Sequence, residues 1–274
     1  MKAALPRACY FDLDGTLVDS SGSIHPLVQD SIQWLHNAGI LVGIATGRPW
    51  FATKSIAELL KVSAPCLSFS GALINEPSIW TPLYSKGLQG RQVRDIIHYC
   101  REKEWYLELY DSETYYTENH TQLSSIHAEY LQISAEVIDF DTHMRDDREY
   151  LKAVVMFEAK PPESALQELS KRIPHIEMSI AQGAAHPNIY FLNLTHSSAG
   201  RLSGLNQICR MLHCTPREIM AFGDSSSDVP FLSSVEWGIA MGNASDEVKS
   251  AARYTISSVE EQGIYRFLHE FLSQ

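Results

Sequence analysis

The chain has 274 residues, which is enough for one large domain or two domains of ordinary size. Its 45% hydrophobic and 20% charged residues are typical of a globular protein with a substantial core. With 33 acidic residues against 22 basic ones, the net charge of -11 argues against nucleic acid as a partner, although it is compatible with one small phosphorylated ligand.

The sequence does not indicate membrane attachment or secretion. The longest apolar segments, such as residues 39–45, are far shorter than a bilayer span, and Asp12 and Asp14 interrupt the only apolar run near Met1. The five cysteines form no CxxC pair, which argues against a disulfide framework and a thiolate zinc site. We therefore expect a cytoplasmic protein without a membrane partner, and the sequence does not indicate its oligomeric state.

The two outer thirds of the chain alternate strand-like and helix-like segments. Buried strands are expected at residues 8–11, 40–45, 65–69, 219–222 and 237–241, and helices at 26–38, at 50–60 and from Ser245 onward. A capping box in "TPRE", residues 215–218, marks a further helical turn. Continuous apolar strands alternating with amphipathic helices predict an α/β fold, with a doubly wound, Rossmann-like parallel sheet covered on both faces.

The middle of the chain has a different pattern. Expected strands at 150–157 and 175–181 are mixed with expected helices near 90–104, 121–133 and 162–172. We interpret this stretch as an α+β domain inserted into the first domain, which then resumes with the strand-like residues 188–194. The expected division is a core of residues 1–82 and 187–274 and an inserted domain of residues 83–186.

Polar residues follow the expected core strands at the points where the strands end. They are, with the glycines beside them, Asp12 and Asp14 after the first strand, Thr46 and Gly47 after the second, Ser70 and Gly71 after the third, Asp224 and Asp228 after "IMAF", and Asn243 after "WGIAM". Because an open parallel sheet binds ligands beyond the carboxyl ends of its strands, we expect these residues to share one crevice. Such a carboxylate cluster suits Mg²⁺, whose charge would offset the mutual repulsion.

The spacing of Asp12 and Asp14 favours two different catalytic roles for the two carboxylates. With a cation present, one carboxylate can attack a phosphorus atom while the other moves a proton. Gly15 allows a sharp turn that presents both carboxylates to one point.

Four motifs resemble those of the haloacid dehalogenase superfamily, and more narrowly its Cof-type phosphatases with a large α/β (class IIB) cap. They are "DLDGT" at 12–16, "TGR" at 46–48, "GDSSSD" at 223–228 and "AMGNASDEVKSAARYTISS" at 240–258. The resemblance implies a Mg²⁺-dependent phosphoric monoester hydrolase that acts on a small phosphorylated metabolite.

The resemblance also implies roles for individual residues. Asp12 would be the nucleophile that forms an aspartyl-phosphate, Asp14 would act as the acid and base, and Thr46 with Gly47 would bind the phosphoryl group. The metal would be held by Asp12, Asp14 (through its backbone carbonyl), Asp224 and Asp228, with Gly15, Thr16, Ser227 and Asn243 in support.

Two departures from the family pattern affect these roles. Arg201 stands where the family usually has a lysine, although a register shifted by two would place Ala199 there. Arginine keeps the positive charge and can bind phosphate through two nitrogens, so we expect Arg201 to be a phosphate ligand. Ser227 and Ser70 stand at positions where asparagine is usual, and they still donate hydrogen bonds with a shorter reach.

Other interpretations of the same residues give different functions. An EF-hand calcium loop fails because Leu17 and Ser23 occupy the positions that need glycine and glutamate. "FGDSSSD" also resembles the nucleophile block of GDSL-type ester hydrolases, with Ser225 as nucleophile, but the downstream His269 lacks an aspartate three positions before it. A non-catalytic phosphate-ligand binding or regulatory protein on the same scaffold is a further alternative. The sequence does not choose among sugar phosphates, flavin mononucleotide and pyridoxal phosphate as substrates.

Overall fold

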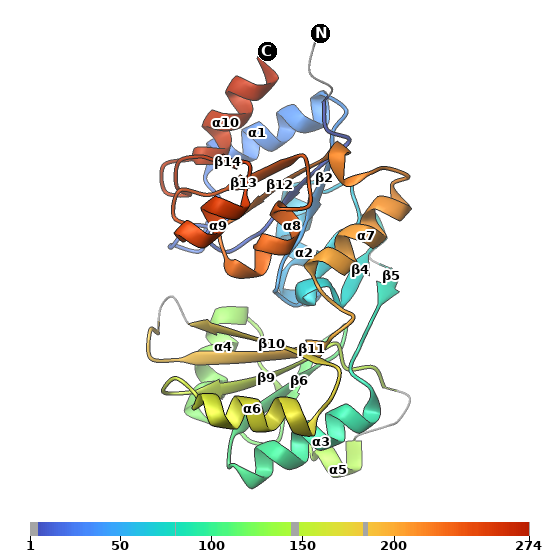
Figure 1. Ribbon diagram of the computed structural model, residues 1–274, viewed down its shortest axis with the longest axis vertical. Coiled ribbons are helices and arrows are strands. Elements are labelled where there is room, and N and C mark those ends of the chain that lie inside the picture. Colours follow the sequence, from blue (N-terminus) through green and yellow to red (C-terminus); the bar gives the residue numbers. More distant parts are fainter. Residues whose placement is uncertain (1–4, 80, 144–147, 183–185, 274) are drawn as a thin grey trace. The chain divides into compact units, whose positions relative to one another are not determined.

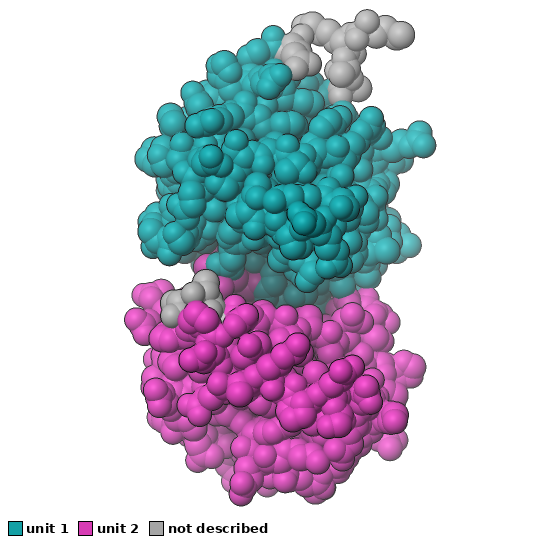
Figure 2. All heavy atoms as spheres, turned by 60° about the vertical axis from the view of Figure 1, so that its left-hand side comes forward, with its two compact units in different colours: residues 1–47, 54–84, 200–274 teal, residues 48–53, 85–199 magenta. Residues whose placement is uncertain are grey.

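The computed structural model describes residues 5–79, 81–143, 148–182 and 186–273. The chain forms two compact units, each with its own sheet (Figure 1), and Figure 2 marks the residues of each. The first unit comprises Met1–Gly47, Lys54–Tyr84 and Gly200–Gln274, and the second comprises Arg48–Thr53 and Ser85–Ala199.

A five-stranded parallel sheet forms the centre of the first unit, in the order β14-β13-β12-β1-β2. Its strands are β1 Ala8–Phe11, β2 Leu41–Ile44, β12 Ile219–Gly223, β13 Trp237–Ala240 and β14 Tyr254–Thr255. Phe11 of β1 is level with Phe222 of β12 and Ile44 of β2, so these three strands end together at one edge.

Helices cover both faces of this sheet. Successive side chains of a strand point to opposite faces, so the apolar side chains of these strands need cover on both. The helices are α1 Pro26–Asn37, α2 Lys54–Leu59, α7 Arg201–Met211, α8 Val229–Leu232, α9 Asp246–Ala251 and α10 Gly263–Leu272. Tyr10 packs against Phe231 of α8, whereas Phe11 stacks on Phe222, whose ring also contacts Phe267 of α10. In Figure 1, α1 and α10 lie together on one side of the sheet, with α8 and α9 on the other.

A smaller sheet extends this unit, with strands β3 Cys66–Ser68, β4 Leu73–Asn75 and β5 Pro82–Ser85. β3 continues the parallel arrangement of β2 through a bridge between Ala45 and Leu67. A 3-10 turn, Phe69–Gly71, connects β3 to β4.

The second unit contains a six-stranded sheet in the order β10-β11-β9-β6-β7-β8. The strands are β6 Tyr106–Tyr110, β7 Tyr115–Thr117, β8 Glu136–Val137, β9 Lys152–Phe157, β10 Ile176–Gln182 and β11 Tyr190–His196. Among these strands, β7 and β8 pair in parallel and the other neighbours pair antiparallel.

The two faces of the six-stranded sheet differ in chemistry. The helices of this unit are α3 Gly90–Glu102, α4 Gln122–Leu131, α5 Phe140–His143 and α6 Glu163–Arg172. One face packs apolar residues such as Leu109 and Val155 with Ile96 of α3 and Leu169 of α6. On the other face, buried Glu108 accepts a hydrogen bond from the Tyr110 hydroxyl at 2.5 Å and contacts His127 of α4 at 2.6 Å.

The structure corrects two of the expected element assignments. Residues 188–194 were expected to resume the core, but β11 pairs antiparallel with β9 and β10, so the second unit extends to Ala199. The helix expected at 50–60 is instead a 3-10 turn, Trp50–Ala52, followed by α2, with the Thr53 hydroxyl donating to the Pro49 carbonyl at 2.9 Å. Within the described residues, no helix combines the length and apolar character needed to span a membrane.

Candidate active site

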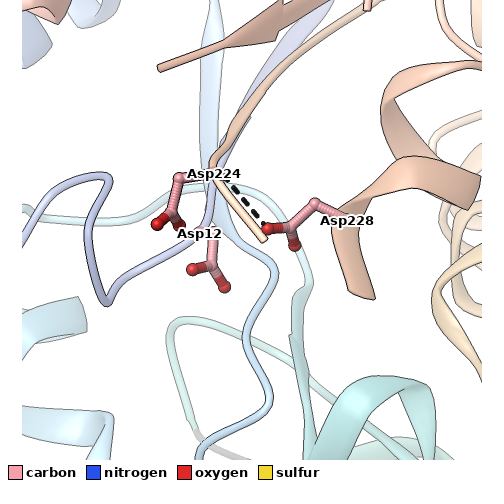
Figure 3. Close-up of side chains that lie close together, drawn as sticks. All are labelled: Asp12, Asp224 and Asp228. Atoms are coloured by element: carbon pink, nitrogen blue, oxygen red, sulfur yellow. Dashed lines mark hydrogen bonds between the residues drawn. The ribbon is translucent and has the colours of Figure 1, made fainter. Parts of the chain in front are cut away.

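Three carboxylates converge at the carboxyl edge of the five-stranded sheet. Asp12 follows β1 and Asp224 follows β12, which are neighbouring parallel strands. Asp228 ends the 3-10 turn Ser226–Asp228 after β12, and in Figure 3 it points toward the other two from this separate turn. One carboxylate oxygen from each residue lies within 4.8 Å of the others. The structure thus brings together three of the four residues expected to hold a metal.

The two oxygens of Asp228 have different partners. Oδ2 accepts hydrogen bonds from the Asp224 N–H at 3.2 Å, drawn as a dashed line in Figure 3, and from the N–H and hydroxyl of Ser225 at 3.0 and 2.8 Å. Oδ1 lies 2.9 Å from Nη2 of Arg201. Asp228 therefore fixes the loop that carries Asp224 and also orients Arg201.

Arg201 occupies the centre of this charge cluster as the first residue of α7. Its Nη2 donates to Asp12 Oδ1 at 2.8 Å and pairs with Asp228, while Nη1 donates to the Ala45 carbonyl. Arg201 is only 5% exposed, so it is not a solvent-facing helix residue, and its place in the cluster favours its register over the one with Ala199. Burial lowers the pKa of the guanidinium, but Asp228 and Asp12 outweigh this and raise the pKa above its usual value.

The guanidinium of Arg201 does not fully offset the negative charges of the three carboxylates. Burial raises the pKa of Asp12 well above its usual value, Asp228 raises it further, and Arg201 only partly opposes this. Burial, and then Asp228, also raise the pKa of Asp224 from 3.8 to about 7. Because three carboxylates face one guanidinium, a divalent cation would stabilise their ionised forms. The all-oxygen donor set fits Mg²⁺, which Asp12, Asp224 and Asp228 would hold.

Three of the predicted supporting residues surround Asp224. Gly15 has a φ of +73°, and a Cβ at this position would lie 2.2 Å from Asp224 Oδ2, so only glycine permits this approach. The Thr16 hydroxyl donates to Asp224 Oδ1 at 3.2 Å. The Asn243 amide donates to the Gly15 carbonyl at 2.9 Å and to Asp224 Oδ2 at 3.3 Å. These contacts hold the Gly15 turn and the Asp224 carboxylate together.

The remaining predicted residues lie at the ends of neighbouring strands. Asp14 is half-buried, and its charge contributes to the raised pKa of both Asp12 and Asp224. Thr46 is buried; its N–H donates to the Leu67 carbonyl at 2.9 Å. Gly47 follows Thr46 directly in the chain. The carboxylate of Asp14 is not one of the three that approach within 4.8 Å.

Ser227 and Ser225 make contacts that differ from their predicted roles. Ser227 is exposed and its hydroxyl pairs with that of Ser225 at 2.8 Å, so in this structure it supports the turn and not the carboxylates directly. Ser225 donates its hydroxyl to Asp228. His269, the histidine that a Ser225 triad would need, instead packs its ring against Trp34 and Tyr265. These contacts argue against the ester-hydrolase alternative.

Sequence reasoning missed two main-chain contributions to this site. The Ala45 carbonyl accepts from Arg201, and the Val259 N–H donates to Asn243 Oδ1 at 3.0 Å. Main-chain groups carry no residue-specific signal, so the sequence could not have indicated either contact.

Comparison with known proteins gives a match over most of the chain. A family model described as haloacid dehalogenase-like hydrolase matches residues 9–268. The chain is 25% identical over 272 residues to a 5-amino-6-(5-phospho-D-ribitylamino)uracil phosphatase of Bacillus subtilis, covering 98% of each chain. It is 26% identical over 267 residues to a putative phosphatase of Haemophilus influenzae, covering 96% of this chain and 97% of the relative.

Solved structures share the fold. A phosphatase of the haloalkanoate enzyme superfamily from Bacteroides thetaiotaomicron has a TM-score of 0.83 and 22% identity, covering 97% of this chain and 95% of that one. A subclass IIB sugar phosphatase has a TM-score of 0.82 and 22% identity, covering 97% and 98%. These similarities confirm the predicted α/β fold class.

Proposed function

Because the chain belongs to the haloacid dehalogenase-like hydrolases, we propose that it is a Mg²⁺-dependent phosphatase that works through an aspartyl-phosphate on Asp12. The chain is an enzyme, a phosphoric monoester hydrolase, and the resemblance identified from its motifs is confirmed. Beyond the family and the enzyme class, we propose the metal, the covalent intermediate and the residue roles.

One observation carries this proposal above the others. Asp12 lies buried between the carboxylates of Asp224 and Asp228 and the guanidinium of Arg201, with carboxylate oxygens of the three aspartates within 4.8 Å. With a divalent cation bound among the three carboxylates, this arrangement would keep Asp12 ionised in a buried place, as a nucleophilic carboxylate requires.

The residues divide the reaction as follows. A carboxylate oxygen of Asp12 attacks phosphorus while the bond from phosphorus to the leaving oxygen breaks, and Asp14 gives that oxygen a proton. Asp14 then takes a proton from the water that hydrolyses the aspartyl-phosphate. Thr46, Gly47 and Arg201 bind the phosphoryl oxygens. Asp12, Asp224 and Asp228, with the backbone carbonyl of Asp14, would hold the metal. When bound, Mg²⁺ would supply positive charge that offsets the charge on the transferring group.

The two units have separate tasks in this proposal. The first unit, which carries every residue named above, acts as the catalytic core, and the second acts as the cap that selects the substrate. The substrate is a small phosphorylated metabolite, since named relatives act on phosphoribitylaminouracil or on sugar phosphates. A cytoplasmic location is part of the proposal, supported by five cysteines that are all free thiols.

Hydrolysis of p-nitrophenyl phosphate by the full chain tests the proposed function. We expect turnover with Mg²⁺ that is abolished by EDTA, and a loss of at least about a thousandfold in Asp12→Asn. Asp30→Asn is the matched control, because Asp30 is exposed on α1 and should leave the rate unchanged. Turnover that survives in Asp12→Asn would contradict the assigned nucleophile.

The same preparations discriminate the two alternatives. Hydrolysis of p-nitrophenyl acetate that continues after chelation would support an ester hydrolase. Binding of inorganic phosphate without turnover of any phosphorylated metabolite would support a binding protein. A screen of sugar phosphates, flavin mononucleotide and pyridoxal phosphate then identifies the substrate class.

A further inference from the structure

A short turn next to the candidate active site has an unusual backbone. Phe69, Ser70 and Gly71 follow β3 with φ angles of +50°, +57° and +109°, so three successive residues have left-handed or otherwise positive φ. Phenylalanine and serine rarely adopt this conformation, and runs of it persist only where the surrounding structure enforces it. Such outliers gather at ligand-binding positions, which makes the contacts of this turn informative.

The turn lies between the two segments that we propose to hold the phosphoryl group. On one side, the Ser70 N–H donates to the Thr46 carbonyl at 3.1 Å. On the other side, a Cβ at Gly71 would lie 2.3 Å from the carbonyl oxygen of Gly200, the residue that precedes Arg201. Only glycine fits at position 71, so the turn sets the spacing between Thr46 and the start of α7.

Ser70 is more exposed than the two residues beside it. Phe69 and Gly71 are buried, whereas Ser70 is only half-buried. Its hydroxyl lies 3.4 Å from the position that a Cβ of Gly47 would occupy, which places a hydrogen-bond donor directly beside the Thr46–Gly47 segment. The backbone of the turn thus keeps one polar group accessible where the phosphoryl oxygens are expected.

We propose that the Ser70 hydroxyl is a further substrate-binding group, which donates a hydrogen bond to the phosphoryl group held by Thr46, Gly47 and Arg201. This inference rests on the proposed function, because it takes the phosphoryl position from those residues. The left-handed backbone of residues 69–71 exposes the hydroxyl. The contacts of this turn with Thr46 on one side and with Gly200 on the other keep it in that conformation.

Calorimetric binding of inorganic phosphate to the full chain with Mg²⁺ tests this contact without turnover. Because a hydrogen bond to a charged group is lost, Ser70→Ala and Ser70→Gly should both weaken phosphate binding about tenfold or more. Ser70→Asn should recover part of the affinity, because asparagine tolerates the left-handed region and keeps a donor. Ser70→Gly removes the hydroxyl without straining the backbone, because glycine adopts this φ freely. This variant should therefore fold at least as stably as the unaltered chain.

Ser68→Ala is the matched control. Ser68 lies two residues earlier in β3, and its buried hydroxyl has no hydrogen-bond partner among the described residues, so its removal should leave phosphate affinity unchanged. Phosphate affinity in Ser70→Gly equal to that of the unaltered chain would overturn the inference, because only the backbone of the turn would then matter. An altered KM for a phosphate ester with unchanged phosphate affinity would also overturn it, by assigning Ser70 to the leaving group.

Failure of this inference is distinguishable from failure of the proposed function. If the unaltered chain hydrolyses p-nitrophenyl phosphate and the Ser70 variants bind phosphate normally, only the Ser70 contact is wrong. If phosphate binding depends on Ser70 but no turnover occurs, the contact stands and the proposed catalysis is wrong.

Discussion

At the scale of single residues, the site is governed by the pairing of buried charges. Arg201 contacts Asp12, Asp228 and the Ala45 carbonyl with one guanidinium, a set of contacts that a single ammonium group cannot reproduce in the same geometry. Breaking one side of a buried ion pair costs about 3–5 kcal/mol, because the other charge is left uncompensated. Removal of this side chain would therefore leave Asp12 and Asp228 uncompensated, in addition to the loss of the phosphate ligand that we propose.

The raised pKa of Asp224 leads to a prediction about pH and stability. In the metal-free protein this pKa is about 7 instead of 3.8, mainly because of burial and then because of Asp228. Between these two pH values the folded protein binds a proton that the unfolded chain has released. The stabilisation is therefore complete below about pH 4 and is lost as pH rises through 7.

Urea unfolding in EDTA between pH 4 and pH 8 measures this contribution. We expect the free energy of unfolding of the unaltered chain, relative to Asp224→Asn, to fall by on the order of 2–4 kcal/mol over this range. Saturating Mg²⁺ should reverse the fall near pH 8, because the cation binds the ionised carboxylate. A difference between the two proteins that does not change with pH would show that Asp224 titrates normally. Asp30→Asn provides the control for a surface carboxylate.

At the scale of elements, one simple rule explains why the structure brings carboxylates of the predicted site together. Parallel strands such as β1 and β12 end at the same edge, so Asp12 and Asp224 become neighbours although 212 positions separate them (224 minus 12). The rule fails for contacts that depend on local backbone, such as the positive φ of Ser70 and the carbonyl of Ala45. It also does not indicate that the Ser227 hydroxyl pairs with the hydroxyl of Ser225.

The loop after β1 provides a prediction at this scale. In Gly15→Ala the new methyl group would meet Asp224 Oδ2 at 2.2 Å, so we expect catalytic efficiency to fall at least about a hundredfold, because a displacement of about 1 Å at a reacting centre has that cost. Mg²⁺ affinity should fall as well. Steady-state kinetics and Mg²⁺ titration measure both effects.

Gly39→Ala is the control for this variant. Gly39 has a φ of +75°, close to the +73° of Gly15, but a Cβ there would meet nothing within 4 Å. Both variants should lose about 1 kcal/mol of stability from backbone strain, and only Gly15→Ala should lose activity. Equal activity in the two variants would show that the approach of Gly15 to Asp224 has no catalytic importance.

At the scale of the whole molecule, the sequence predicts the α/β core and an inserted α+β unit, but places the return to the core too early. β11 is an apolar seven-residue strand, and its pattern alone does not indicate which sheet it joins. β11 pairs with β10 at seven positions, and these antiparallel hydrogen-bonded neighbours place β11 in the sheet of the second unit. The same limit applies to Arg48–Thr53, which belong to the second unit although residues on both sides of them belong to the first.

Rapid acid quenching is the most direct test of whether Asp12 carries the phosphoryl group during turnover. Full-length protein is mixed with Mg²⁺ and a phosphorylated substrate, quenched within milliseconds, and digested for mass spectrometry. We expect a phosphoryl adduct on the peptide that contains Asp12, and no adduct in Asp12→Asn or in EDTA. A phosphoryl group found on any other residue, or turnover with Mg²⁺ that continues in Asp12→Asn, would contradict it.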